Sequence, residues 1–150
     1  GSAGGHLAAA TATLPELDNA TDDKSVSCRP DALVLFNPGT VMAPFPGLDL
    51  KGFGAGLDKA RFGCEPTEIS PLHHVAKGAP PTIVFHGKAD TTVPYATVEK
   101  FAAVMKAAGN RCELVGYEGE KHGFFNQSKY AETLAATDDF LVSLGYLPKK

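Results

Sequence analysis

Short apolar runs, separated by Gly- and Pro-rich stretches, set the pattern of this chain. The runs at 32–36 (ALVLF) and 82–85 (TIVF) contain no alternation of polar and apolar positions, and a third run covers 113–117. A continuous run of this length is typical of a strand buried on both faces, as in a parallel sheet. The sequence therefore predicts three buried strands, the first of which stops at Asn37-Pro38.

Apolar or small residues at helical spacing predict helices before and after these strands. Residues 3–13 are rich in Ala and Gly, which suits a helix lying close to a sheet, and Pro15 ends it. A second helix is expected after Pro94, with Gly109-Asn110 as a left-handed cap. Its apolar face consists of Val98, Phe101, Ala102, Met105 and Ala108. A last helix, capped by Gly145, is expected to bury Tyr130, Leu134, Thr137, Leu141 and Leu144.

The order of these elements is helix, strand, long excursion, strand, helix, strand, helix. Strands that alternate with helices favour parallel pairing, so we expect an α/β fold in which helices flank a parallel sheet. Residues 15–30 are polar and are expected to form an exposed connection. The irregular excursion at 38–80 holds much of the Gly and Pro, with one or two short helices expected; so long a connection is usually functional. Residues 1–150 then form a single domain, or part of one.

Charge and composition exclude some function classes. The net charge is −3, with no basic stripe for nucleic acid, and no apolar run approaches the roughly 20 residues of a membrane span. The cysteines have neither metal nor redox spacing. A Cys28–Cys64 bridge can form in an oxidising compartment, whereas Cys112 is expected to be a buried thiol. Localisation stays open: any signal peptide would lie upstream of Gly1, and secreted and periplasmic settings both fit.

Some residues near the start of the chain suit acyl-transfer chemistry, which needs a nucleophile, a base, an orienting acid and oxyanion donors. Ser2 lies among small residues in GSAGGH, before an apolar helix, where a tight turn would expose its hydroxyl. The backbone N–H of Ala3 would then point at the oxyanion. On these six residues alone, an equally good interpretation is that Gly1-Ser2 is a cloning remnant.

The acid and the base are expected after the second and third strands. Asp90 lies in HGKADTTVP and His122 in EGEKHGFF. Catalytic groups gather at the carboxyl ends of parallel strands, so Asp90 is expected within hydrogen-bond reach of His122. Taken alone, Asp90 also fits a turn and His122 a surface loop. The remaining histidines are interpreted as structural or as pocket-wall residues: His6, His73, His74 and His86.

The segments GSAGGHLAAA, HGKADTTVP and YEGEKHGFFN resemble the nucleophile elbow, acid loop and histidine loop of α/β-hydrolase-fold esterases. The nearest groups are the lipases and esterases near hormone-sensitive lipase and the bacterial carbohydrate-esterase-like enzymes. The resemblance covers essentially the whole chain, as the C-terminal half of that fold. It implies Ser2 as nucleophile, Asp90 as orienting acid, His122 as base and Ala3 as an oxyanion donor. It also implies a small ester substrate, with acetylated carbohydrates as one class, and no cofactor or metal.

The start of the sequence departs from that pattern. The glycine expected two residues before Ser2, the strand leading into the elbow and the upstream His-Gly-Gly-Gly-type loop are absent. We therefore expect the N-terminal remainder of the same protein as a partner, and a strand at 32–36 that lacks a neighbour on one side. Alone, such a chain would be poorly stable and weakly active, because an open strand exposes unpaired N–H and C=O groups.

Two alternatives to an esterase stay open. The segment SPLHHV at 70–75, with the strand after it, also resembles the catalytic domain of prolyl-oligopeptidase-type serine peptidases. The other alternative is a non-catalytic fragment that retains the fold. For an esterase, the excursion is expected to shape the substrate pocket, with Phe45, Leu48 and Phe53 as its apolar contacts.

Overall fold

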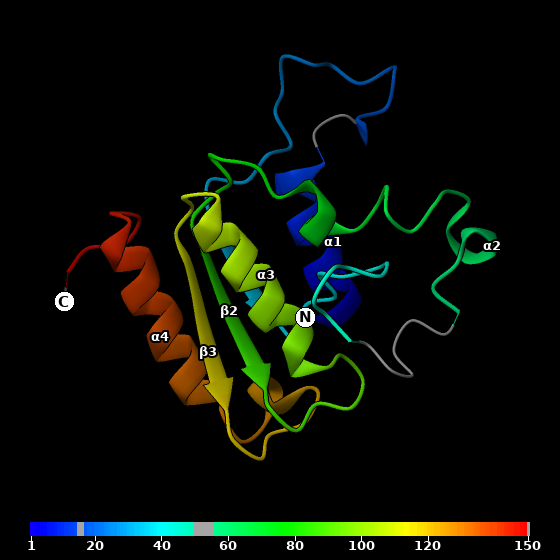
Figure 1. The fold of residues 1–150 in the computed structure, drawn as a ribbon. Coiled ribbons are helices and arrows are strands. Elements are labelled where there is room, and N and C mark those ends of the chain that lie inside the picture. The colour runs from blue at the N-terminus through cyan, green and yellow to red at the C-terminus, as the bar shows by residue number, and fades with distance from the viewer. Residues whose placement is uncertain (15–16, 50–55, 150) are drawn as a thin grey trace.

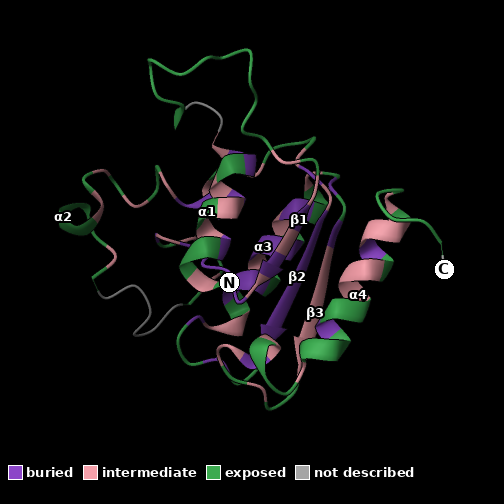
Figure 2. Cartoon of the chain, turned by 180° about the vertical axis from the view of Figure 1, so that it is seen from behind, coloured by how far each residue is buried: buried purple, intermediate pink, exposed green. Residues whose placement is uncertain are grey.

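A three-stranded parallel sheet forms the centre of the computed structural model, which describes residues 1–14, 17–49 and 56–149. The strands are β1 (Leu33–Phe36), β2 (Thr82–Gly87) and β3 (Cys112–Tyr117), in the order β1-β2-β3. Figure 1 shows β2 and β3 with helices packed around them, and Figure 2 shows all three strands from behind. The prediction of three parallel strands in an α/β arrangement is confirmed. In the described part of the chain β1 is an edge strand, as expected.

The central strand β2 pairs with both of the other strands. All six of its residues are buried, as Figure 2 shows. It pairs from Thr82 to Phe85 with β1 and from Thr82 to Gly87 with β3, so it continues two residues past the predicted end at Phe85. Because all pairs are parallel, the three carboxyl ends lie at one edge of the sheet.

Helices cover both faces of this sheet. The helices α1 (Ser2–Thr13) and α3 (Tyr95–Ala107) pack on one face, and α4 (Tyr130–Ser143) packs on the other. As predicted, Gly109 and Gly145 follow α3 and α4 in the left-handed conformation, with φ of 80° each. None of the helices in the described part of the chain combines the length and hydropathy that a membrane span needs.

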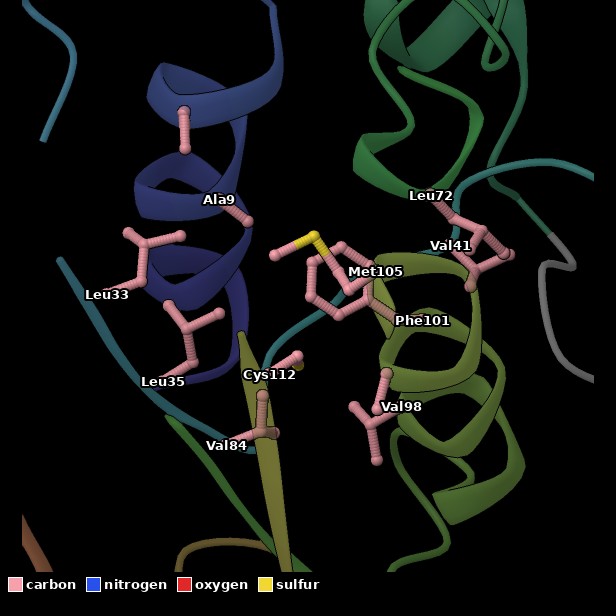
Figure 3. Packing of buried hydrophobic residues seen from close by; sticks show 12 residues of the cluster. Ala9, Leu33, Leu35, Val41, Leu72, Val84, Val98, Phe101, Met105 and Cys112 are labelled. Carbon is pink, nitrogen blue, oxygen red and sulfur yellow. The ribbon is translucent and has the colours of Figure 1, made fainter. Parts of the chain in front are cut away.

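Each face has its own apolar cluster, because successive side chains of a strand point to opposite faces. Val84 joins Ala9 of α1 and Phe101 of α3 in the larger cluster, which Figure 3 shows. Phe85 points the other way and joins Phe140 of α4. The larger cluster also holds Cys112, and burial raises the pKa of this thiol to about 11.

The excursion between β1 and β2 returns to the core in several places. It contains a short helix, α2 (Lys59–Phe62), and a 3₁₀ turn, η2 (Pro71–His74), in line with the one or two short helices expected. Leu72 of η2 is buried in the larger cluster. Residues 17–29 are exposed, as predicted. Pro15, the predicted end of the first helix, lies outside the described residues.

One possibility that the sequence left open and one expectation are not realised. The Cys28–Cys64 bridge is not formed, since both residues carry free thiols. The predicted inner face of α4 is wrong at its start, where Tyr130 is 61% and Leu134 is 48% exposed, while Thr133 is buried. The buried Thr133 hydroxyl donates to the Lys129 carbonyl within the helix, so its burial leaves no unpaired donor. A prediction that uses apolar residues alone therefore misplaces the buried face of α4 around the helix axis.

Helix α1 approaches the end of β1 through a glycine. A Cβ added to Gly5 would lie 2.9 Å from Cβ and 3.0 Å from Cα of Pro38. No atom lies within 4 Å of the corresponding position on Gly4, its neighbour in the same helix. The small residues at the start of α1 therefore have different roles: Gly5 is required for close packing, and Gly4 is not.

Replacement of these two glycines is expected to change stability in opposite directions. Gly5→Ala should lower the free energy of unfolding by about 1–3 kcal/mol, because a methyl group is forced against Pro38. Gly4→Ala should raise it by roughly 0.5–1 kcal/mol, because Ala favours the helix and has space. Urea unfolding of both variants checks this. Equal effects would show that α1 does not depend on contact with Pro38.

Candidate active site

Asp90 lies in a tight turn directly after β2. Its backbone N–H donates to the carbonyl of Gly87 at 3.2 Å, and its side chain is fully buried. One carboxylate oxygen, Oδ1, accepts hydrogen bonds from the backbone N–H groups of Thr92 at 2.8 Å and Val93 at 2.9 Å. The turn that leads into α3 therefore fixes the orientation of this carboxylate.

The other carboxylate oxygen faces two side chains from distant parts of the sequence. Oδ2 lies 2.7 Å from Nδ1 of His122 and accepts a hydrogen bond from Nδ2 of Asn37 at 2.9 Å. The expected contact between Asp90 and His122 is therefore present. An imidazole that donates from Nδ1 to a carboxylate carries its lone pair on Nε2, the tautomer that a general base needs. His122 keeps 29% of its side chain exposed.

The surroundings of Asp90 favour its charged form. Burial by itself raises the pKa of this carboxyl group, but the bonds from the Val93 N–H, His122 and the Thr92 N–H outweigh burial. The net result is a pKa below the ordinary value of 3.8. Asp90 is therefore ionised at neutral pH and can stabilise a positive charge on His122.

Gly87 allows the loop that carries His122 to cross the end of β2. A Cβ at this position would collide with the backbone carbonyl of Glu120. The same carbonyl accepts a hydrogen bond from the N–H of Ala89 at 2.9 Å, and Gly123 completes the loop with a φ of 82°. The sequence placed Gly87 at a strand end but contained no signal for this contact.

The start of α1 lies at the same edge of the sheet. The N–H of Gly39 donates to the carbonyl of Ser2 at 3.4 Å, and a Cβ on Gly1 would lie 2.7 Å from the ring of Phe125 in the histidine loop. Ser2 has a φ of 51°. Ala3 follows in the first turn of α1, where backbone N–H groups have no acceptor within the helix.

Backbone strain in the described residues is confined to this edge. Ser2 and Asn37 are the non-glycine residues with positive φ in the described part of the chain, at 51° and 44°. Such conformations cost about 1–3 kcal/mol each and cluster at functional sites. The sequence had marked Asn37 only as the end of a strand, and its contact with Asp90 was not predicted.

A protein-family comparison covers much of this site. The model of the prolyl oligopeptidase family matches residues 59–145, more than half of the chain. The matched segment contains both Asp90 and His122. The chain belongs to the prolyl oligopeptidase family.

Solved structures similar to this family member are esterases. A thermophilic esterase from Thermogutta terrifontis, solved with propionate bound, is 46% identical with a TM-score of 0.88, over 100% of this chain and 56% of that one. Esterase 2 of Thermogutta terrifontis phosphorylated by paraoxon is 42% identical with a TM-score of 0.85, over 100% and 54%. This chain therefore spans about half the length of those structures. The fold is that of the α/β-hydrolase esterases, and the resemblance seen in the sequence is confirmed.

A curated relative matches over a shorter stretch. A protein named as a probable isoprenylcysteine alpha-carbonyl methylesterase, from Oryza sativa subsp. japonica, is 40% identical over 43 residues. These residues are 29% of this chain and 10% of that protein. Its name, like those of the solved structures, is that of an ester hydrolase.

In this prolyl oligopeptidase family member, His86 lies in β2 next to Asp90. It is fully buried in β2, and its Nε2 lies 2.8 Å from the carbonyl of Val93 and 3.3 Å from Oδ2 of Asp90. His6, His73 and His74 each lie within hydrogen-bond distance of a backbone carbonyl, at Ile69, Pro44 and Thr67 respectively. These contacts fit the structural interpretation of all four histidines.

The predicted pocket residues of the excursion are only partly described. The ring of Phe45 packs edge-on against His73 at 5.1 Å, and Leu48 packs against the larger core cluster. Phe53 lies outside the described residues. A cavity of about 480 Å³, lined by Thr13, Ala79 and their neighbours, lies near the amino ends of the strands, at the opposite edge from Asp90. A role for Phe45 and Leu48 in substrate binding stays a prediction.

Protonation of His86 is expected to destabilise the fold in mild acid. Burial lowers the pKa of His86 below 6.5, so the folded protein holds it neutral while the unfolded chain takes up a proton. The associated stability is complete above pH 6.5 and is lost as the pH falls toward the lowered pKa. Urea unfolding across this range should show a smaller pH slope for His86→Gln than for the unmodified protein.

His74, which is exposed, supplies the matched control. His74→Gln should keep the slope of the unmodified protein, because it replaces a side chain at the surface and leaves the buried His86 in place. Equal slopes for His86→Gln and the unmodified protein would contradict the assignment of a neutral buried imidazole.

Proposed function

We propose that the protein containing this chain is a serine hydrolase that cleaves small carboxylic esters through an acyl-enzyme. Ser2 is the nucleophile, His122 the base and Asp90 the orienting acid. The observation that carries the proposal is the 2.7 Å contact between Asp90 and His122, beside the start of α1. Its support from the comparisons is the likeness to esterases over the whole chain.

The proposed reaction follows from the protonation states at this edge. Nε2 of His122 takes the proton of the Ser2 hydroxyl as Oγ attacks the ester carbonyl. The resulting imidazolium is stabilised by the ionised carboxylate of Asp90, and the backbone N–H of Ala3 donates to the oxyanion. His122 then gives its proton to the leaving alkoxide. A water molecule, deprotonated by His122 in turn, hydrolyses the acyl-enzyme.

The acyl group is proposed to be short. The relative from Thermogutta terrifontis was solved with propionate bound, and a form of it is phosphorylated by paraoxon. A serine nucleophile in this protein would react with an organophosphate in the same way. Acetylated carbohydrates stay a further substrate class, since an acetyl group is smaller than propionyl.

A further part of the same protein is proposed to complete the site. This chain spans about half the length of the esterase structures that it matches. A second oxyanion donor is proposed to come from outside the chain, and the loss of one such donor costs about 10²–10³ in rate. The substrate-binding role of Phe45, Leu48 and Phe53 belongs to this proposal as well.

Substitution of the proposed nucleophile and of the proposed orienting acid tests the proposal directly. In the intact protein, Ser2→Ala should abolish both hydrolysis of p-nitrophenyl butyrate and labelling by a fluorophosphonate probe. Asp90→Asn should lower kcat by about 10⁴-fold, because His122 loses the partner that sets its tautomer. Asp31→Asn, a change at an exposed aspartate, is the control and should leave kcat unchanged.

The labelled peptide decides between an enzyme and a non-catalytic fragment. Mass spectrometry should find the phosphonate adduct on Ser2. Labelling that persists in Ser2→Ala would assign the nucleophile to another residue. An intact, folded protein that takes no label would favour the non-catalytic alternative.

Peptide hydrolysis is the second candidate function, and membership of the prolyl oligopeptidase family favours it. The two activities separate by comparison of kcat/KM on p-nitrophenyl butyrate and on a peptide p-nitroanilide with proline before the scissile bond. We expect turnover of the ester and no measurable turnover of the anilide. A higher kcat/KM on the anilide would make the protein a peptidase with the same triad.

A further inference from the structure

Asn37, the first residue after β1, connects three segments that meet at the candidate site. Its backbone N–H donates to the carbonyl of Phe85 at 2.9 Å, which extends the pairing of β1 with β2 by one residue. Its Nδ2 donates to Oδ2 of Asp90 at 2.9 Å, and its Oδ1 accepts from the N–H of Gly123 at 3.4 Å. The residue is fully buried.

The amide has the chemistry that this position requires. Asp90 needs a donor, and the N–H of Gly123 needs an acceptor, so one side chain must offer both. Asn offers a donor and an acceptor without adding charge, whereas an acid would repel the carboxylate of Asp90. The φ of 44° also selects for this residue type, because Asn is among the few side chains that adopt the left-handed region readily.

The two side-chain bonds of Asn37 act on the acid and the base together. Nδ2 shares Oδ2 of Asp90 with Nδ1 of His122, so it limits rotation of the carboxylate away from the imidazole. Oδ1 holds the N–H of Gly123, the residue directly after His122. A shift of Asn37 would therefore move both partners of the 2.7 Å contact.

We propose that Asn37 is a positioning residue, which sets the distance and angle between Asp90 and His122. This inference rests on the proposed function, because it assigns Asn37 a role in that triad. Asn37 acts through Asp90 and His122, so its loss should lower kcat with little change in KM. Misplacement of a catalytic group by about 1 Å can cost about 10²-fold in rate.

Substitution by glycine tests the side chain without adding backbone strain. Asn37→Gly tolerates the positive φ and removes both side-chain bonds. In the intact protein it should lower kcat on p-nitrophenyl butyrate by about 10²-fold, with KM nearly unchanged. Asn110→Gly is the matched control, because Asn110 is also buried and bonds Gly78 and Ala76 at the other end of the sheet. It should reduce stability but not kcat.

A double-mutant cycle separates this inference from the function on which it rests. If Asn37 acts through Asp90, Asn37→Gly should lower kcat no further when Asp90→Asn is already present. Fully additive losses would overturn the positioning role. A normal kcat in Asp90→Asn would overturn the triad itself. A normal kcat in Asn37→Gly, combined with a large loss in Asp90→Asn, would overturn only the role of Asn37.

A readout besides activity completes the test. The proton on Nδ1 of His122, held by Asp90, should give a far-downfield NMR resonance in protein labelled with ¹⁵N-histidine. Asn37→Gly should broaden or shift this resonance, and Asn110→Gly should leave it in place. An unchanged resonance in Asn37→Gly would overturn the proposal whatever the kinetics show.

Discussion

The carboxylate of Asp90 is a charge without solvent exposure, and the arrangement at this edge of the sheet follows from the need to satisfy it. A buried charge is tolerated only when hydrogen bonds replace its lost hydration. Two backbone N–H groups of its own turn, the amide of Asn37 and the imidazole of His122 supply them. These donors come from segments that follow all three strands. The hydrogen bonds that satisfy the Asp90 carboxylate therefore hold together segments that are far apart in the sequence.

The sequence predicted the elements whose signals are local. Buried parallel strands carry uninterrupted apolar runs, and the left-handed caps need glycine, so three strands and two caps were found. The contact between Asp90 and His122 was also predictable, because both residues follow strands that end at one edge. The face of α4 was misjudged, since Thr133 is buried through a hydrogen bond within its own helix, and hydropathy does not encode that.

Other features depend on tertiary contacts that leave no trace in a single sequence. In the sequence, Asn37 indicated only the end of a strand. Its hydrogen-bond partners Asp90 and Gly123 lie 53 and 86 residues further along the chain. Gly87 looked like a strand end, although what requires a glycine there is the carbonyl of Glu120. Family membership and esterase likeness also point to different substrates. One fold supports several activities, and the groups that choose among them are separate from the acid and base.

The close approach of Glu120 to Gly87 divides the chain into parts with different freedom to evolve. The loop from Tyr117 to His122 rests on the backbone of the central strand, so a change in its length would lift the imidazole from its partner. Residues 56–68 of the connection between β1 and β2 are mostly exposed, and long loops accept insertions at little thermodynamic cost. Lineages that share this scaffold can therefore diversify the residues facing a substrate by lengthening or rebuilding that connection. The contact of Gly87 with the Glu120 carbonyl, by contrast, restricts changes in the spacing between the third strand and the histidine.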